Sequence, residues 1–439
     1  MPTSMLVLLG LVAVVLVPWF GWKWLDHRTN KVGQALHDDA MSLGEELVPI
    51  SLHPDIKPDQ CISSGACTKA CPEDEVLMMV EGQARLVNPL SCVGHGECMR
   101  ACPVGAISLV FGTATRGVEL PRVSTTFETT QQGVYIVGEL GGMGLIRNAI
   151  EQGRQAAMAI IKSGRRSVVA DFDAIVVGAG PAGIAASLAL MSHGLRIQMV
   201  EQGQYGGTIR HYPRAKLVMS GHLDFPGYGK IRRKTMSKED LIELWDDIRD
   251  RMKFPVREGE KIERITKTPA GWAVSSATWN STAANVILAL GRRGAPRELG
   301  VPGEELNKVH YRVIEPDPFK DKHVLIVGGG NAAADCALAL AEAGENFCRS
   351  VSISYRKHEF MRMRSTVRAR LLKYVDAGKI NAYLGTEVSL IERSMVSLRS
   401  AEGEHQLIND AVIIQIGGTL PNELLRSVGI ELVEKFAEA

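Results

Sequence analysis

Six of the eight cysteines in this chain lie in two runs of the same spacing. The first run is CISSGACTKACP, at 61–72, and the second is CVGHGECMRACP, at 92–103. Clustered thiolates bind iron–sulfur centres or zinc, and a proline directly after the last cysteine is typical of iron–sulfur ligation. Where such a motif would have its second cysteine, the first run has Ser64 and the second has His95.

The two runs resemble those of bacterial two-cluster ferredoxins, in which the fourth cysteine of each run binds the other cluster. The resemblance implies two interleaved sets of thiolates, namely Cys61, Cys67 and Cys102, and Cys71, Cys92 and Cys98. Three thiolates suffice for a [3Fe–4S] cluster, or for a [4Fe–4S] cluster whose fourth iron has another ligand. An imidazole can replace a thiolate at iron, so His95 is a candidate metal ligand. Ser64 is a poorer ligand, and water could serve in its place.

Two other interpretations of the cysteines are open. A disulfide framework also clusters cysteines, but normally in a short secreted chain without nucleotide-binding motifs. A zinc site would accept three cysteines together with His95. The matched spacing, with Pro72 and Pro103 after the last cysteines, favours iron. Between the two runs, the alternating segment MMVEGQARLVNP predicts a short hairpin.

A glycine-rich turn follows the strand predicted in FDAIVVGAGPAGIAASLAL. Gly178, Gly180 and Gly183 form a G-x-G-x-x-G pattern, which provides a tight turn, close approach of a pyrophosphate and close helix–strand packing. The next predicted strand, IQMVE, ends in Glu201, at the distance where an acid binds a ribose hydroxyl. This acid makes an ordinary tight turn the less favoured interpretation.

A second turn of this kind lies in KHVLIVGGGNAAADCALALAEAG. Gly328 and Gly330 hold the first two glycine positions, and Ala333 holds the third. The next predicted strand ends in Arg356 and Lys357 rather than in an acid. Because a cation neutralises a 2′-phosphate that an acid would repel, we expect NADPH to be preferred to NADH. The alternative is that these basic residues form a solvated face.

The segment at 260–291 predicts a run of short antiparallel strands. Two nucleotide sites that flank such a run resemble the thioredoxin-reductase-like flavoproteins. The segments HYPR and SKEDLIELW are similar to the bacillithiol-disulfide-reductase branch, and Ser237 in the second is a predicted helix N-cap. The resemblance implies FAD at the first turn and a nicotinamide cofactor at the second. The expected fold class is α/β. It comprises two Rossmann-like dinucleotide-binding domains of the thioredoxin reductase type, preceded by a small α+β ferredoxin-like module and one transmembrane helix.

The flavoprotein part lacks the cysteines that such relatives use. Thioredoxin reductases carry a C-x-x-C before the nicotinamide unit, and the bacillithiol branch places a cysteine inside its first glycine turn. This chain has neither, and only Cys336 and Cys348 lie in that part. A thiol–disulfide mechanism is therefore disfavoured, and no catalytic acid or base is implied.

The element that covers the flavin in such relatives, a strand, a Gly-Asp pair and a helix, is expected at the C-terminus but is not found there. Residues 127–161 have that shape and precede the first glycine turn, with Gly138 and Glu139 ending the strand GVYIVG. We therefore infer a circular permutation, in which Glu139 takes the place of the relatives' Asp beside the flavin. The chain near 439 should then lie close to residue 118, and the iron–sulfur module should lie near the flavin. A chance strand–turn–helix linker is the alternative.

The segment MLVLLGLVAVVLVPWFGWKW, at 5–24, is apolar and carries no charge before Lys23. Twenty helical residues span roughly the 30 Å of a bilayer's hydrocarbon core. Tryptophans at one end, followed by Lys23, Arg28 and Lys31, predict that the rest of the chain faces the cytoplasm. A cleaved signal peptide would need basic residues before the apolar run and an A-x-A-like site after it, and neither is present. We expect an uncleaved single-pass anchor in the cell inner membrane.

Composition is consistent with this organisation. The 50 basic and 49 acidic residues nearly balance, so charge gives no reason to expect a nucleic-acid partner. The 44 glycines and 5% aromatic residues suit an α/β nucleotide-binding protein. The expected segments are an anchor at 1–25, a linker at 26–52, an iron–sulfur module at 53–112, an FAD domain at 118–298 and 408–439 with its closing element at 118–165, and an NADPH domain at 299–407.

The expected function is that of a membrane-anchored oxidoreductase. It would pass electrons between NADPH, FAD, one or two iron–sulfur clusters and a ferredoxin, quinone or cytochrome acceptor. A homodimer is a further expectation. The alternatives are a non-catalytic electron-transfer subunit of a larger membrane redox complex and, less favoured, a thiol–disulfide reductase.

Overall fold

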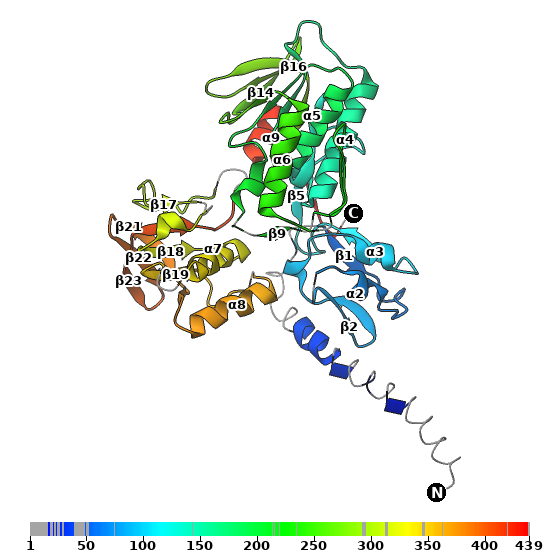
Figure 1. Ribbon diagram of the computed structural model, residues 1–439. Helices are drawn as coiled ribbons and strands as arrows, with labels where there is room; N and C mark the ends of the chain where they lie inside the picture. Colours follow the sequence, from blue (N-terminus) through cyan, green and yellow to red (C-terminus); the bar gives the residue numbers. More distant parts are fainter. Residues whose placement is uncertain are drawn as a thin grey trace, which may run out of the picture. The chain divides into compact units, whose positions relative to one another are not determined.

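The computed structural model describes most of the chain from residue 52 onward (Figure 1). The described residues are 16–17, 21, 23, 27–28, 30–38, 49 and 52–437, apart from 74, 143, 213, 215, 219, 234, 292–295, 312–314, 345–346, 362 and 419. Most of the predicted anchor and much of the predicted linker therefore lie outside the described residues. Within the described ranges, no helix combines the length and the apolar character needed to cross a bilayer. Contacts divide the chain into two compact units, Met1–Gly117 with Phe436–Ala439, and Val118–Lys435.

The first unit contains a small α+β module in which both cysteine runs have the same local structure. Strands β1 and β4 pair antiparallel, and β2 and β3 form the predicted hairpin. Glu81 and Gly82 form its turn with φ values of 51° and 77°, as a two-residue type I′ turn requires. Each cysteine run contains one short helix. The elements are β1 (His53–Ile56), α2 (Ala66–Ala70), β2 (Leu77–Val80), β3 (Gln83–Leu86), η2 (Pro89–Ser91), α3 (Glu97–Ala101) and β4 (Ile107–Val110).

A seven-stranded sheet organises the first part of the second unit, in the order β13-β8-β7-β16-β15-β14. The long strand β16 pairs antiparallel with β15 through its first residues. Its last residues pair parallel with β7 on one side and with β6 on the other. The predicted run of antiparallel strands is confirmed as β14, β15 and β16. The strands are β6 (Val134–Ile136), β7 (Phe172–Val177), β8 (Ile197–Val200), β13 (Val256–Arg257), β14 (Arg264–Thr268), β15 (Gly271–Ser275) and β16 (Asn280–Leu288).

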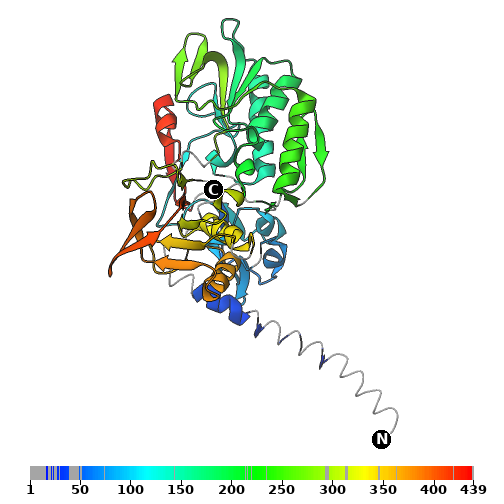
Figure 2. The same ribbon diagram turned by 60° about the vertical axis from the view of Figure 1, so that its left-hand side comes forward.

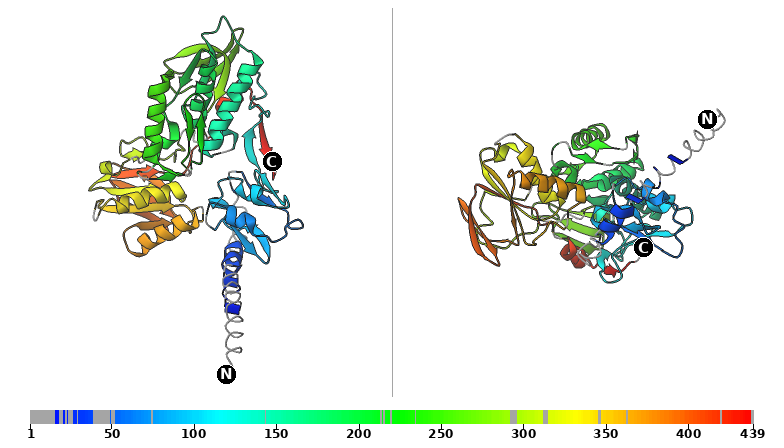
Figure 3. Two further views of the ribbon diagram at one scale, coloured as in Figure 1. Left: turned by 45° about the vertical axis from the view of Figure 1, so that its right-hand side comes forward. Right: turned by 90° about the horizontal axis from the view of Figure 1, so that it is seen from below.

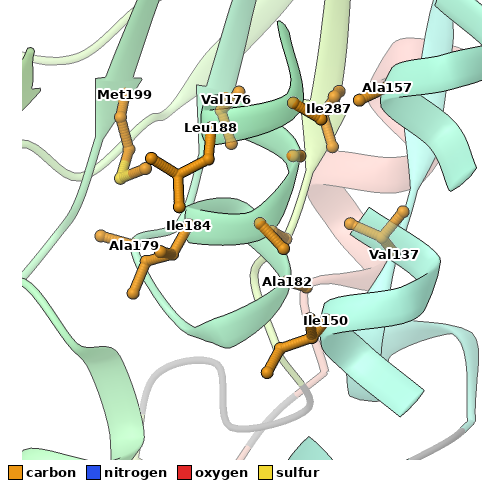
Figure 4. Packing of buried hydrophobic residues seen from close by; sticks show 14 of the residues in the cluster. Val137, Ile150, Ala157, Val176, Ala179, Ala182, Ile184, Leu188, Met199 and Ile287 are labelled. Carbon is orange, nitrogen blue, oxygen red and sulfur yellow. The ribbon is translucent and has the colours of Figure 1, made fainter. Parts of the chain in front are cut away.

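Both faces of this sheet are covered, and its central parallel strands are mostly apolar, although Asp173 and Asn285 are also buried there. Figures 1 and 2 show α4 (Ile146–Ser163), α5 (Pro181–Ser192) and α6 (Lys238–Met252) on one face. Figure 4 shows Leu188 of α5 near Val176 and Met199 of the sheet, and Ile150 of α4 beside Ala182 of α5. Alternate residues of these strands, such as Ile175 and Val177, face the other side of the sheet. There α9 (Asn422–Val428) packs against them. The predicted N-cap of α6 is confirmed, since Ser237 and Asp240 form a capping box.

The second part of this unit is a five-stranded parallel sheet in the order β17-β24-β18-β19-β20, next to an antiparallel sheet of β21, β22 and β23. Strand β24 pairs with β17 and β18, although the predicted FAD segment 408–439 included it. All four β24 residues are buried, as expected of a strand inside a parallel sheet. The elements are β17 (Val309–His310), η5 (Asp317–Phe319), β18 (His323–Val327), α7 (Asn331–Glu342), β19 (Ser350–Tyr355), α8 (Ser365–Asp376), β20 (Asn381–Leu384), β21 (Glu387–Ile391), β22 (Met395–Ser400), β23 (Gly403–Ile408) and β24 (Ala411–Ile414).

The two ends of the second unit pair with each other. Strand β5 (Val118–Pro121) runs antiparallel to β25 (Leu432–Lys435), with Val118 opposite Lys435 (Figure 3, left). The predicted closeness of the chain near 439 to residue 118 is thus confirmed for the last described strand. The remaining elements are η3 (Gly138–Gly141), η4 (Gly207–His211), β9 (Leu217–Val218), β10 (Leu223–Phe225), β11 (Gly229–Ile231) and β12 (Met236–Ser237).

Candidate cofactor sites

The first glycine turn connects β7 to α5 and has the shape that a dinucleotide requires. A Cβ on Gly178, at φ 108°, would lie 2.3 Å from the carbonyl oxygen of Ala289, and one on Gly183 would lie 2.0 Å from that of Gly178. These two positions therefore admit only glycine. At Gly180, the N-cap of α5, a Cβ would meet no other atom within 4 Å. A pyrophosphate can reach the backbone N–H groups of the helix N-terminus through this open space.

Glu201 follows β8 directly and is held against this turn. Its two carboxylate oxygens accept hydrogen bonds from the backbone N–H groups of Ala179, at 2.8 Å, and Gly203, at 2.9 Å. The residue is 8% exposed. Each oxygen keeps a second lone pair, so the carboxylate can still accept from the hydroxyls of a ribose. The structure thus brings the predicted acid and the predicted glycine turn together.

The proposed closing element lies against the same turn. Strand β6 extends the sheet beside β16, and Gly138 at its end has φ 81°. A Cβ on Gly138 would lie 3.2 Å from the Cβ of Ala182, in the first turn of α5. The backbone N–H of Gly138 donates to the buried Gln152 side chain of α4 at 2.7 Å. Residues 134–142 are therefore neighbours of the first nucleotide turn.

Glu139, the predicted counterpart of the relatives' Asp, is exposed. Its carboxylate faces the backbone after η3, since a Cβ on Gly144 would lie 3.6 Å from its Oε1 atom.

Two further contacts join the ends of the second unit. The Gln131 side chain donates to the backbone carbonyl of Gly429 at 2.8 Å, and Arg122 pairs with Glu431 at 3.0 Å.

The second glycine turn connects β18 to α7 and has the same construction. A Cβ on Gly328, at φ 144°, would lie 2.4 Å from the carbonyl oxygen of Gln415, and the space beside Gly330 is open. Ala333 is fully buried where α7 packs on the sheet. A Cβ on Gly329 would collide with the ring of Tyr355, which ends β19 and stacks on Phe360 with centroids 5.8 Å apart. The aromatic pair thus sets how closely the strand end approaches the turn.

The predicted basic residues follow Tyr355 directly. Arg356 is exposed and Lys357 is half-buried. The loop that they begin is tied to the helix N-terminus, because the backbone N–H of Arg364 donates to the side-chain oxygen of Asn331 at 2.8 Å. This bond holds the loop that begins at Arg356 against the N-terminus of α7.

The six clustered cysteines line two separate cavities in the first unit. One cavity is lined by Cys61, Cys67 and Cys102, with Ser64. The other is lined by Cys71, Cys92 and Cys98, with His95. These are the two interleaved sets that the ferredoxin resemblance implies. Three inward-facing thiols per cavity fit a cluster that takes its remaining ligand from elsewhere.

Burial and mutual repulsion oppose ionisation of these thiols when no metal is bound. Burial, with a smaller contribution from the neighbouring Cys71, raises the pKa of Cys92 and of Cys98 to about 11. Burial likewise raises the pKa of Cys67, with added contributions from Cys61 and Cys102. A cationic cluster core would relieve this repulsion, as expected of metal ligands.

None of the eight cysteines takes part in a disulfide, so a disulfide framework is not formed. In the described part of the chain, no group of three or more His, Cys, Asp and Glu side chains is arranged to hold a single metal ion. The sulfur atoms therefore line the two cavities without forming a closed mononuclear site.

Several residues at these sites were not identified from the sequence. Gln152 and Asn331 act on backbone groups far away in the chain, and no local pattern marks such contacts. Gly153 in the middle of α4 could have been recognised, because a glycine inside a helix costs about 1 kcal/mol and is usually retained for packing.

The fold and the two turns define a class, the two-nucleotide-site oxidoreductases, here joined to a module with two cysteine-lined cavities. Comparison with known families agrees. The family profile described as pyridine nucleotide-disulphide oxidoreductase matches residues 175–437, and the chain belongs to this family. The profile described as 4Fe-4S dicluster domain matches residues 53–103. The chain is therefore an FAD-dependent pyridine-nucleotide oxidoreductase whose cofactors are FAD, NADPH and iron–sulfur clusters.

Individual relatives cover the flavoprotein part. A ferredoxin–NADP reductase of Ignicoccus hospitalis is 29% identical over 270 residues, which cover 59% of this chain and 82% of the relative. The bacilliredoxin reductase Bdr of Bacillus subtilis is 27% identical over 269 residues, covering 59% and 81%. The solved structure of the bacillithiol disulfide reductase Bdr (YpdA) from Bacillus cereus aligns with a TM-score of 0.52 at 23% identity, covering 59% and 82%. This last likeness concerns the fold alone.

Proposed function

We propose that this protein is a membrane-anchored NADPH oxidoreductase that passes electrons between NADPH, FAD and its own iron–sulfur clusters, and onward to a ferredoxin, a quinone or a cytochrome. One observation carries the proposal: a flavoprotein with two nucleotide turns and no cysteine pair is fused to a module with two three-cysteine cavities. The clusters take the place of the missing thiols as the route for electrons.

The two remaining cysteines are unsuited to thiol chemistry. Burial raises the pKa of Cys336 to about 12 and that of Cys348 to about 11. The thiolate is the nucleophile in disulfide exchange, so both are nearly unreactive at neutral pH. Cys336 is 5% exposed inside α7, and the Cys348 thiol donates to the carbonyl of Phe319. Both are structural residues under this proposal.

When bound, NADPH supplies hydride, FAD exchanges one or two electrons, and iron–sulfur clusters carry one electron at a time. The residues of the chain bind and orient these groups. The open backbone at Gly180 and Gly330 would bind the two pyrophosphates, and Glu201 would bind the ribose of FAD. Arg356 and Lys357 would neutralise the 2′-phosphate of NADPH. The six cysteines would hold the iron.

The relatives named ferredoxin–NADP reductases support this assignment. Their names specify a ferredoxin as a substrate, and this chain carries a dicluster domain of its own. We infer that this domain acts as a covalently attached redox partner of the flavin, which replaces a diffusional encounter by a tethered one.

We also infer that the flavoprotein is circularly permuted. Three contacts support the permutation. Strand β6 pairs with β16, Gly138 lies against Ala182, and β25 pairs with β5. The family match begins only at residue 175, after the closing element. Membrane attachment through 5–24, with the remaining chain in the cytoplasm, rests on the apolar run and the basic residues that follow it.

Anaerobic steady-state kinetics of the full chain in detergent test the proposed function. NADPH oxidation is measured with ferricyanide, with cytochrome c and with a low-molecular-weight disulfide. We expect turnover with the one-electron acceptors and none with the disulfide. The double variant Cys67→Ser/Cys98→Ser should keep ferricyanide reduction by the flavin and lose most cytochrome c reduction.

The alternatives give different results. Turnover that depends on the disulfide and is lost in Cys348→Ala or Cys336→Ala would establish the thiol route. If the chain contains flavin but oxidises no NADPH with any of the three acceptors, it is a non-catalytic subunit. Cytochrome c reduction that persists in Cys67→Ser/Cys98→Ser would remove the clusters from the electron path.

A further inference from the structure

The two cysteine runs present their non-cysteine residues with the same backbone conformation. Ser63 and Gly94 precede these residues with φ values of 60° and 74°, and Gly65 and Gly96 follow them with φ values of 64° and 76°. Ser64 and His95 therefore occupy equivalent corners of the two cavities, and both line them. Any difference between the corners comes from the side chains and their surroundings, since the local backbone is shared.

The turn that carries His95 is firmly held. Arg100 of α3 donates to the backbone carbonyl of His95 at 3.0 Å and pairs with Glu97 at 2.6 Å, which fixes the turn to the helix. A Cβ on Gly94 would lie 2.6 Å from the carbonyl oxygen of Leu52, so the turn packs directly on the preceding chain. The cavity wall beyond it includes Val76, which is 1% exposed. A half-buried imidazole on such a fixed turn is well placed to bind iron.

The Ser64 corner differs in that its side chains are exposed to solvent. Ser64 is exposed, and its hydroxyl accepts a hydrogen bond from the backbone N–H of Ala66 at 3.5 Å. The residues that flank this cavity are also exposed, Ile62 by 62% and Val104 by 45%. A serine side chain is shorter than an imidazole, and a neutral hydroxyl is a weak ligand for iron. Solvent therefore reaches the corner that the hydroxyl does not close.

We propose that the two clusters differ at their fourth iron. His95 binds the fourth iron of the cluster held by Cys71, Cys92 and Cys98. Ser64 would leave the fourth iron of the cluster held by Cys61, Cys67 and Cys102 without a protein ligand, so that site would be open to water or to a small donor such as cyanide. This inference rests on the proposed iron–sulfur function and adds a ligand-binding site to it.

Electron paramagnetic resonance of the full chain, reduced anaerobically with dithionite, tests the proposal with and without cyanide. In the unaltered protein, one cluster signal should shift with cyanide, and the other should not. Pulsed measurements should detect a strongly coupled ¹⁴N nucleus only on the signal that does not shift. A cyanide response of both signals, or of neither, would overturn the proposal.

Matched variants assign each signal to its corner. Ser64→Cys restores the missing cysteine and should abolish the cyanide shift, whereas Ser64→Ala should leave it intact. His95→Ala should remove the ¹⁴N coupling and make the second cluster respond to cyanide, and His95→Cys should remove the coupling without that response. Retention of the cyanide shift in Ser64→Cys, or of the coupling in His95→Ala, would contradict the assignment.

Metal analysis separates this inference from the proposed function. Absence of iron and acid-labile sulfide from anaerobically prepared protein would refute the clusters themselves. Presence of both, with two signals that behave alike, would refute only the difference between the corners.

Discussion

Gly153, in the middle of α4, lies directly against Ala182, in the first turn of α5. A Cβ on Gly153 would lie 2.1 Å from the carbonyl oxygen of Ala182 and 3.2 Å from the backbone nitrogen of Ala186. The helix of the proposed closing element thus touches the backbone of the helix whose N-terminus would bind the FAD pyrophosphate. This contact is possible only because position 153 has no side chain.

Gly153→Ala should therefore destabilise the flavoprotein unit, although alanine favours a helix by about 0.5–1 kcal/mol. The obstacle is backbone, so α4 must shift, and overpacking of this kind costs about 1–3 kcal/mol. Urea unfolding and the FAD content of the purified chain measure the effect. Gly141→Ala, at a position with open space and no positive φ, is the control and should change little. Unchanged stability in Gly153→Ala would mean that the helices do not pack this closely.

Glu201→Gln should weaken FAD binding about tenfold or more. The amide NH₂ group would replace one of two oxygens that accept from Ala179 and Gly203, which places donor against donor in a buried site. Such a group costs about 1–3 kcal/mol. Flavin fluorescence titration of the apoprotein measures the dissociation constant. Glu263 is an exposed residue directly before β14, and Glu263→Gln should leave the dissociation constant unchanged. Equal affinity in both variants would exclude a role for Glu201.

Arg356→Ala/Lys357→Ala should raise the KM for NADPH about tenfold or more while leaving the KM for NADH nearly unchanged. Hydrogen bonds to a charged group contribute about 1.5–3 kcal/mol, and NADH has no 2′-phosphate to make them. Initial rates with ferricyanide and each nucleotide provide the comparison. Arg393→Ala removes an exposed cation between β21 and β22 and serves as the control. A similar rise for both nucleotides would refute the assignment of the 2′-phosphate site.

A chain with the relatives' element order should fold and bind FAD. Because Val118 pairs with Lys435, residues 171–435 can be followed by Asn-Gly and then by 118–164, with a two-residue hairpin closing the strands. The new ends fall in an exposed loop, where Val168 and Val169 are 101% and 78% exposed. Flavin content and far-ultraviolet circular dichroism are compared with those of residues 118–437 in the natural order. The permutation would be contradicted if the rearranged chain were insoluble or free of flavin while residues 118–437 in the natural order were soluble and bound flavin.

Gly94→Ala should impair the iron–sulfur module more than Gly105→Ala. Both glycines have a positive φ, of 74° and 67°, so each substitution costs about 1–2 kcal/mol in backbone energy. Only at position 94 would the new Cβ also meet a carbonyl oxygen, whereas position 105 faces open space. Iron content per chain and the rate of cluster loss under air measure the difference. Equal losses would show that Leu52 does not pack on this turn.

Local patterns in the sequence were sufficient for the elements that carry the cofactors. A glycine turn after an apolar strand, a helix N-cap at Ser237 and matched cysteine spacings depend on residues a few positions apart, and such contacts form with little loop-closure entropy. The sequence therefore predicted both nucleotide turns, the antiparallel strands before β17 and the hairpin between the cysteine runs. It also predicted which cysteines belong together, through the resemblance to two-cluster ferredoxins.

Contacts between distant segments could not be obtained in this way. Strand β24 has the same apolar pattern whether it belongs to the FAD sheet or to the nicotinamide sheet, and only its pairing with β17 and β18 distinguishes the two. The ring of Tyr355 over Gly329 and the approach of Gly153 to Ala182 likewise depend on how separate elements pack. Residue types and short spacings specify which groups can bind a cofactor. Long-range pairing and close packing specify where those groups meet. Many arrangements of the elements satisfy the same local pattern, but only one of them buries all of the apolar side chains.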